Sequence, residues 1–370
     1  MKIPFVDLKE QYLSIKDEID HAISTVISET SFIGGFHVNN FEQEFQNKYG
    51  VNHCISCANG TDSLYIIMKM LGIGSGDEVI TVANSWISTS ETISQTGATP
   101  VFVDCEADFF TINVNEIEAK ITANTRAIIP VHLYGQMCDM DKLLEISKKH
   151  SIFLIEDCAQ SHFSKFNNVK AGLHGHAASF SFYPGKNLGA YGDAGAIITN
   201  NDSFAQSFKM FARHGALVKH NHIIEGINSR MDGLQAAILS VKLKRIEDWT
   251  RQRQENAKKL TYALNGIENI KTPAIRENSE HSFHLYVIQA ENRDGLAEFL
   301  KSREIEVAIH YPTPLPLLPA YEKYNYKSED FPVASNLSKY ILSLPLYPEL
   351  SEGAINYIAS SIKEFYSINL

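Results

Sequence analysis

The chain has 370 residues, a formal net charge of −10 and a hydrophobic content of 44%. This length and composition are typical of a globular protein with one large and one smaller domain, and the acidic balance gives no support for binding to nucleic acid or to an anionic membrane. The N-terminus lacks the apolar run of a signal peptide, and no stretch approaches the ~18 apolar residues of a membrane span, so we expect a cytoplasmic protein without a membrane segment.

The five cysteines are an odd set in a large chain without a secretion signal, so reduced thiols are expected. Cys54 and Cys57 form a C-x-x-C, but they lie in the alternating run V-N-H-C-I-S-C, which is typical of a buried strand. No second cysteine pair could complete a zinc site, so we predict no metal ligands.

Residues 1–50 contain helical segments around the glycines of F-I-G-G. From about residue 52, short apolar runs alternate with helical segments, beginning with H-C-I-S-C-A and a helix from Thr61 to Leu71. The further predicted strands are D-E-V-I-T-V, T-P-V-F-V-D, R-A-I-I-P-V-H-L-Y, I-F-L-I-E-D-C-A, A-S-F-S-F-Y and G-A-I-I-T-N. This alternation predicts an α/β fold with a largely parallel sheet and helices on both faces.

The pattern changes near residue 230. Residues 231–265 form one long helical pattern, ended by Gly266. The strand H-S-F-H-L-Y-V-I-Q-A, the helix D-G-L-A-E-F-L-K-S-R and the segment E-V-A-I-H-Y-P follow. We therefore predict a large domain over residues 1–249 and a smaller α+β C-terminal domain over residues 250–370.

The segment S-F-S-F-Y-P-G-K-N-L-G-A-Y-G-D-A-G-A places Lys186 among glycines just after an apolar run. A phosphate-binding loop G-x-x-x-x-G-K-[ST] does not match, because the chain has Phe180 and Asn187 at the positions of the first glycine and the hydroxyl residue. The glycines at positions 189, 192 and 195 lack the G-x-G-x-x-G spacing and precede a strand, which argues against a dinucleotide fingerprint.

Lys186 could be a solvated lysine in a turn, or it could be a covalent nucleophile. A lysine amine forms Schiff bases with carbonyl compounds, and burial or neighbouring cations activate it by lowering its pKa. The strand A-S-F-S-F-Y, stopped by Pro184, would hold the lysine rigidly. We favour the nucleophile.

Asp157 follows the buried run I-F-L-I. An acid at the end of a buried strand is costly unless it has a partner, and ligands bind at the carboxyl ends of the strands in sheets of this kind. A pyridoxal phosphate enzyme needs a carboxylate against the pyridine nitrogen of its cofactor. We favour this role over that of an ordinary helix N-cap, for which Asp is also suited.

Two further motifs allow both a functional and a structural interpretation. Gly60 and Thr61 open a helix directly after a strand, which makes an anion site or simply a capped turn. Trp86 follows another strand, where its ring could stack on a flat cofactor or belong to the core.

These motifs, in this order and spacing, resemble the pyridoxal-phosphate-dependent sugar aminotransferases of the DegT/DnrJ/StrS type. The resemblance extends from I-P-F-V-D-L to L-P-L-Y-P, and its most specific part is F-S-F-Y-P-G-K-N-L-G. It implies a fold-type I aminotransferase that binds pyridoxal 5'-phosphate, or its pyridoxamine form between half-reactions. It also implies a homodimer with active sites at the subunit interface.

The resemblance implies a role for each matching residue. Lys186 would bind the cofactor aldehyde as a Schiff base and later move protons, and Asp157 would pair with the pyridine nitrogen. The other implied cofactor contacts are Gly60, Thr61 and Ser181 at the phosphate, Trp86 on the ring face, Gln160 near the ring hydroxyl, and Asn228 reaching the neighbouring subunit's phosphate. Candidate contacts to the nucleotide sugar are Tyr183, Lys219, Arg230, His310 and Tyr311.

The implied reaction moves an amino group from an amino acid, by analogy glutamate, to a keto sugar carried on a nucleotide. The segments K-L-K-R-I-E-D-W-T-R-Q-R and A-I-H-Y-P are most similar to members that act at C3 of dTDP-linked 3-keto-6-deoxyhexoses. Amination at C4 of a 4-keto sugar and a non-catalytic regulatory protein that binds the cofactor are the alternatives.

The chain also departs from the common family pattern. Ser161, His162, Phe163 and Ser164 replace the usual Ala-His-Gly-Ala, and Ala194 stands at a common glycine position. These changes raise a question about the local loop shape and the fit of the substrate.

Overall fold

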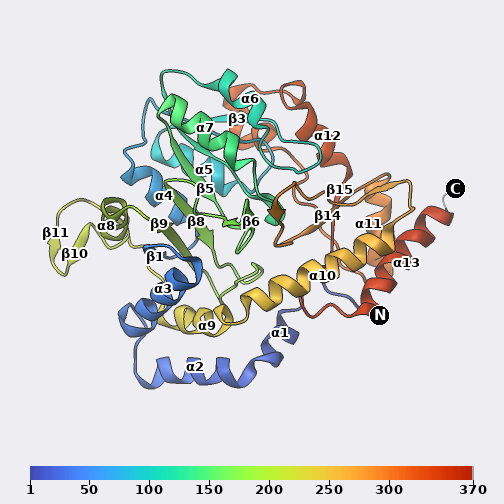
Figure 1. The fold of residues 1–370 in the computed structure, drawn as a ribbon, viewed down its shortest axis with the longest axis horizontal. Coiled ribbons are helices and arrows are strands. Elements are labelled where there is room, and N and C mark those ends of the chain that lie inside the picture. Colours follow the sequence, from blue (N-terminus) through green and yellow to red (C-terminus); the bar gives the residue numbers. More distant parts are fainter. Residues whose placement is uncertain (369–370) are drawn as a thin grey trace.

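The computed structural model describes residues 1–368, and a seven-stranded sheet with the order β1-β9-β8-β5-β4-β2-β3 lies at its centre (Figure 1). The strands are β1 His53–Cys57, β2 Glu78–Val82, β3 Thr99–Val103, β4 Thr125–Ile129, β5 Phe153–Asp157, β8 Ala177–Ser181 and β9 Gly195–Thr199. β9 alone runs in the direction opposite to the other strands of this sheet, so its pairs with β1 and β8 are antiparallel and the remaining pairs are parallel. The predicted mostly parallel sheet of an α/β fold is confirmed.

The strands are continuous apolar runs because both faces of the sheet are covered. In β4, Ile128 packs into one core, whereas Ala127 and Ile129 pack into the core on the opposite face. Successive side chains of a strand point to opposite faces, so a strand covered on both sides needs apolar residues at every position.

Helices from different parts of the chain cover the two faces. One core includes residues of α4 Gly60–Met70, α5 Ser88–Thr96 and α8 Asp202–Phe211. The other includes residues of α2 Lys16–Ser28, α3 Gly35–Tyr49, α6 Val114–Ile117, α7 Met140–His150 and α9 Gly233–Leu243. α1 Leu8–Ser14 precedes α2 at the N-terminus. This arrangement leaves the carboxyl edge of the parallel strands free to form a site.

The predicted single long helix over residues 231–265 is wrong, because two helices form, α9 and α10 Ile246–Leu264. They are separated at Lys244 and Arg245, where the Arg245 N–H donates to the carbonyl of Lys242 at 2.9 Å, three residues back. α9 packs against α2 and α3, whereas α10 packs against α13 Glu352–Ile368 (Figure 1). One straight helix could not pack against α2 and α3 at one end and against α13 at the other. Tertiary packing therefore interrupts a sequence with continuous helical character.

The C-terminal part has a core of its own. It contains residues of α10, α11 Arg293–Ser302, β14 Tyr286–Ala290, β15 Ile341–Leu344 and α13, and also Ile3 from the N-terminus. β12 Ile270–Lys271 pairs with the edge of β14. α12 Pro332–Tyr340 and the 3₁₀ turns Leu315–Leu317, Pro319–Tyr324 and Ser328–Asp330 precede β15. A domain division at residue 250 would fall inside α10, and it stays a prediction.

Short hairpins and turns complete the described chain. β10 Ala216–Val218 and β11 Asn221–His222 form a projecting hairpin, at the far left of Figure 1. β6 Lys165–Phe166 pairs with β7 Val169–Lys170 and with β13 Ser279–Glu280. Two 3₁₀ turns, Glu118–Lys120 and Leu133–Gly135, flank β4 in the sequence.

Two expectations from composition can be compared with this structure. All five cysteines are buried and free in the structure. Within residues 1–368, no helix combines the length and the apolar character needed to cross a membrane.

Candidate active site

A cavity of about 660 Å³, here called the main cavity, lies at the carboxyl edge of the central sheet. Seven of the eight predicted cofactor contacts line it: Gly60, Thr61, Trp86, Asp157, Gln160, Ser181 and Lys186. Three of the five predicted substrate contacts line it as well: Tyr183, His310 and Tyr311. These residues are distant in sequence, and the parallel strand ends bring them together.

The strand register explains how this edge is built. Asp157, the last residue of β5, lies opposite Ser179 of β8, and Ser181 ends β8 opposite Gly195 of β9. Gly60 begins α4 just after β1, and a Cβ built at that position would lie 2.7 Å from the Cβ of Ser181. A side chain at residue 60 would therefore push apart the two strand ends that meet here.

Lys186 is held by a tight loop between β8 and β9. Its N–H donates to the carbonyl of Tyr183 at 2.8 Å, and the N–H of Ala190 donates to the carbonyl of Phe182 at 2.8 Å. A Cβ at Gly189 would lie 2.2 Å from the carbonyl oxygen of Pro184, so the chain reverses too closely for any other residue there. Burial lowers the pKa of Lys186 to about 8, although the negative charge of Asp157 acts in the opposite direction.

Asp157 is a buried carboxylate without a cationic partner in contact. Its Oδ2 accepts a hydrogen bond from Thr89 Oγ1 at 2.9 Å, and its Oδ1 accepts one from the N–H of Ala159 at 3.1 Å. Burial raises the pKa of Asp157, while these two hydrogen bonds and the charge of Lys186 lower it. Within residues 1–368 the carboxylate forms no ion pair, so a positive group in the main cavity would complete its environment.

Gln160 and the aromatic side chains form the rest of the wall. The Nε2 of Gln160 donates to Tyr311 Oη at 3.1 Å, and its Oε1 accepts from the N–H of Tyr134 at 2.7 Å. The rings of Trp86 and Tyr311 are 5.8 Å apart. Trp86 is 57% exposed and Tyr183 is 59% exposed, so neither is a core residue. The alternative that the ring of Trp86 belongs to the core is therefore excluded.

Three predicted site residues lie outside the main cavity. Lys219 and Arg230 are exposed and line a separate groove of about 390 Å³, here called the outer groove, together with Arg213 and several histidines. Asn228 is exposed and pairs with Arg213 in an isolated β-bridge. Within one subunit these three residues do not join the main cavity. Asn228 was expected to reach the cofactor of the neighbouring subunit, and the roles of all three stay predictions.

Sequence reasoning missed the polar residues at the start of α5. Thr89 hydrogen-bonds Asp157, and Ser88 Oγ lies 2.8 Å from Thr61 Oγ1. Both line the main cavity. The available signal was the run S-W-I-S-T, in which hydroxyl residues begin a helix directly after a strand end, as Gly60 and Thr61 do elsewhere.

The residues that depart from the family pattern do not line the main cavity. Ser161, His162, Phe163 and Ser164 are all buried, and the N–H of Phe163 donates to Tyr49 Oη at 3.0 Å. Their bulk is therefore accommodated in the core and does not narrow the space around Lys186.

A second buried cluster lies beneath Asp157. His132, Glu156 and Cys158 bring their possible metal-ligand atoms within 4.8 Å of one another. Glu156, however, accepts hydrogen bonds from the N–H groups of Gly172, His174 and Gly175 at 2.7–2.8 Å, and His132 Nε2 lies 3.0 Å from it. These contacts make Glu156 an anchor between β5 and the following loop.

Comparisons with known proteins identify the family. The model of the DegT/DnrJ/EryC1/StrS aminotransferase family matches residues 13–363. This chain belongs to that family.

It is 42% identical to a pleiotropic regulatory protein of Geobacillus stearothermophilus (99% of each chain covered). It is 39% identical to the dTDP-3-amino-3,6-dideoxy-alpha-D-galactopyranose transaminase of Aneurinibacillus thermoaerophilus (98% of this chain, 99% of the relative). Among solved structures, DesV of S. venezuelae in complex with a ketimine intermediate matches with a TM-score of 0.96 and 35% identity over 98% of both chains.

The chain is therefore a pyridoxal-phosphate-dependent aminotransferase that acts on nucleotide-linked sugars, with the fold that the sequence predicted. The residues of the main cavity fit this cofactor. Lys186 offers an amine with a lowered pKa, and Asp157 offers an unpaired buried carboxylate for the ring nitrogen. The N-terminus of α4, with Gly60 and Thr61, offers N–H groups suited to a phosphate. These individual roles remain predictions.

Proposed function

We propose that this aminotransferase moves an amino group from L-glutamate to C3 of a dTDP-linked 3-keto-6-deoxyhexose, in a pathway of amino-sugar biosynthesis in the cytoplasm. The observation that carries the proposal is the presence of Lys186 and the buried Asp157 in one cavity, which Tyr183, His310 and Tyr311 also line. The C3 assignment is supported by the relative from Aneurinibacillus thermoaerophilus, whose product carries its amino group at C3.

Lys186 and Asp157 have separate tasks in this proposal. When bound, the cofactor would supply an aldehyde carbon to carry the amino group between the half-reactions and a pyridine ring to accept electrons. Asp157 stabilises positive charge at the ring nitrogen, because its carboxylate is buried and has no other cationic partner in contact. Lys186 holds and moves a proton through Nζ, because a lysine whose pKa is about 8 is close to balance between its two protonation states near neutral pH.

A homodimer completes the site in this proposal. Exposed apolar side chains lie on and just after the β10–β11 hairpin and around the start of α3: Ile33 (55% exposed), Phe36 (71%), Leu217 (39%), Val218 (67%) and Ile223 (66%). A second copy would bury them, and the outer groove beside them carries Lys219 and Arg230. The acidic main cavity, with Asp62, Asp157 and Asp193 in its lining, needs such cations for a pyrophosphate.

The test is a product assignment by NMR. The purified enzyme is given glutamate with either a dTDP-linked 3-keto-6-deoxyhexose or its 4-keto isomer. We expect amination of the 3-keto sugar alone. Amination of the 4-keto sugar alone would refute the C3 assignment and favour the C4 alternative.

A regulatory role is the second candidate, because the relative from Geobacillus stearothermophilus is named a pleiotropic regulatory protein. In both cases the protein binds the cofactor, so cofactor binding does not distinguish them. Only an enzyme also turns over its amino-acid substrate. An enzyme converts its bound cofactor to the amine form when glutamate is added, which an absorbance spectrum shows as loss of the visible band. A spectrum that glutamate leaves unchanged would favour regulation.

A further inference from the structure

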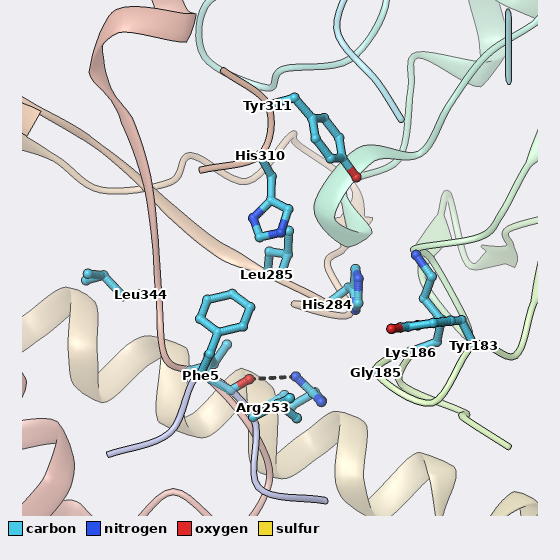
Figure 2. Close-up of a pocket in the computed structure, with 12 residues that line it drawn as sticks. Phe5, Tyr183, Gly185, Lys186, Arg253, His284, Leu285, His310, Tyr311 and Leu344 are labelled. Carbon is cyan, nitrogen blue, oxygen red and sulfur yellow. Dashed lines mark hydrogen bonds between the residues drawn. The ribbon is translucent and has the colours of Figure 1, made fainter. Parts of the chain in front are cut away.

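A second cavity of about 240 Å³, here called the side cavity, adjoins the main cavity at Lys186. Tyr183, Lys186, His310 and Tyr311 line both. Figure 2 shows the side cavity between Phe5 of the N-terminal segment, Arg253 of α10 and the loop that carries Lys186. Arg253 is not among the residues for which the family resemblance implies a contact to the cofactor.

Arg253 is a buried cation without an anionic partner in contact. It is 4% exposed, and its Nη1 donates to the carbonyls of Leu346 at 2.8 Å and Phe283 at 3.2 Å. In the described part of the chain, Nε and Nη2 form no hydrogen bond and the guanidinium forms no ion pair. Glu349 attracts it only through space. Burial lowers the pKa of Arg253 to about 10, so it keeps its charge at neutral pH, and an unpaired buried charge is costly.

Apart from Lys186, the other residues that line the side cavity are uncharged. Burial lowers the pKa of His310 to about 4 and holds the pKa of His284 well below its ordinary value, and the positive charge of Lys186 adds to both shifts. Phe5 and Leu285 supply apolar surface beside them (Figure 2). Lys186 apart, the side cavity therefore combines neutral walls with one permanent cation, Arg253, which is suited to a single anionic group on an otherwise apolar chain.

The main cavity offers no alternative cation for such a group. Among the described residues that line it, Lys186 is the only Lys or Arg, whereas Asp62, Asp157 and Asp193 are acidic. An anionic substituent of a substrate bound at Lys186 would be repelled by the acidic lining and attracted towards Arg253.

We propose that the side cavity receives the side-chain carboxylate of a dicarboxylic amino donor and that Arg253 binds it. The inference rests on the proposed function, since it assumes that the amino donor reacts at Lys186. The size of the side cavity, about 240 Å³, supports a donor side chain, because sites for drug-sized ligands occupy roughly 300–1,000 Å³. Arg253 would be a specificity-determining residue, separate from the chemistry.

Donor specificity tests the proposal. We compare glutamate with 2-aminobutyrate, which lacks only the distal carboxylate, in the donor half-reaction followed by absorbance without any sugar. In Arg253→Gln, the preference for glutamate over 2-aminobutyrate should fall about 10- to 100-fold, since a hydrogen bond to a charged group contributes about 1.5–3 kcal/mol. The kcat/KM for the nucleotide sugar should not change, because the donor takes no part in the second half-reaction. Arg251→Gln is the matched control, because Arg251 is exposed on the same helix and pairs only with Asp248.

Two results would overturn the proposal. An equal loss of rate with both donors would mean that Arg253 only positions the chain through its hydrogen bonds to the carbonyls of Phe283 and Leu346. A rise in KM for the nucleotide sugar, with donor preference unchanged, would mean that Arg253 binds a phosphate. Absence of any half-reaction in the wild-type enzyme would instead contradict the proposed function.

A binding measurement on the wild-type protein decides the same point if Arg253→Gln does not fold or if no half-reaction is found. Titration calorimetry should show that glutarate binds at least about tenfold more tightly than butyrate, which has no second carboxylate. Equal affinities would overturn the proposal.

Discussion

Burial acts in opposite directions on the two charged residues of the main cavity. It lowers the pKa of Lys186 to about 8 and raises the pKa of Asp157, because each charged form loses hydration. The negative charge of Asp157 raises the pKa of Lys186, and the positive charge of Lys186 lowers the pKa of Asp157, so both charges act against burial. The pair therefore favours a reactive amine beside a carboxylate that stays available for a cation.

The attachment of the cofactor to the apoprotein should follow the titration of Lys186. The neutral amine is the nucleophile, so the rate of appearance of the visible band should rise with pH and level off above about pH 8. In Asp157→Asn the midpoint should move to lower pH, because the negative charge that raises the pKa of Lys186 is lost. Stopped-flow absorbance measures both profiles, and a midpoint near pH 10.5 in the wild type would contradict the burial of this amine.

Replacement of Lys186 should separate proton transfer from binding. Lys186→Ala should lower kcat by at least about 10²- to 10⁴-fold, the usual contribution of a positioned acid–base group. The cofactor should still bind noncovalently and without the visible band of the lysine adduct, as equilibrium dialysis and spectra would show. Retention of that band would mean that another lysine is the nucleophile.

At the scale of elements, α9 supports the loop that carries Lys186. Lys242 on α9 is fully buried, and its Nζ donates to the carbonyl of Gly189 at 2.7 Å and lies 4.3 Å from the centroid of the Tyr191 ring. Gln235 Oε1 accepts from the N–H of Tyr191 at 2.8 Å. These contacts fix the loop at a point shortly after Lys186.

Lys242→Met should destabilise the apoprotein by about 1–3 kcal/mol, because the carbonyl of Gly189 loses its buried donor. Burial lowers the pKa of Lys242 to about 8 from its ordinary value of 10.5. Between these values the unfolded chain binds more protons than the folded one, so the stability that Lys242 contributes should rise with pH across this window. The deficit of the variant should therefore grow from pH 8 to pH 10, measured by urea unfolding.

Lys244→Met is the control for this experiment, since Lys244 is exposed just after the same helix. Its effect should stay within about 0.5 kcal/mol at every pH. A Lys242→Met variant as stable as this control would show that the loop needs no support from α9.

At the scale of the whole molecule, the predicted site residues fall into two groups on one subunit. Lys186 and its neighbours line the main cavity, whereas Lys219 and Arg230 line the outer groove. In the proposed homodimer, each site takes one group from each subunit. Symmetry then makes two defective variants complementary.

Mixing Lys186→Ala with the double variant Lys219→Glu, Arg230→Glu should restore activity. Random reassociation after mild unfolding would give hybrid dimers with one intact site, so the mixture should regain on the order of a quarter of wild-type activity. The unmixed double variant should show a larger rise in KM for the nucleotide sugar than loss of kcat. A mixture no more active than its components would place both groups in the same subunit's site.

The sequence alone determined the sheet, the order of its strands along the chain and the residues at the strand ends. Short uninterrupted apolar runs bounded by turn residues are typical of strands covered on both faces, and the carboxyl edge then follows from the parallel direction. Lys186, Asp157 and Gly60 were therefore predictable as neighbours. Their local motifs specify both the residue type and its place at the end of a strand, for Asp157, or shortly after one, for Gly60 and Lys186.

Only the tertiary structure decided the features that depend on contacts between distant segments. The helical sequence breaks between α9 and α10 because its first half packs against α2 and α3 and its second half packs against α13. The support of Asp157 by Thr89 and the unpaired charge of Arg253 depend on side chains brought together from separate elements. The separation of Arg230 from the main cavity has the same origin, since local sequence carries no information about which surface a loop will face.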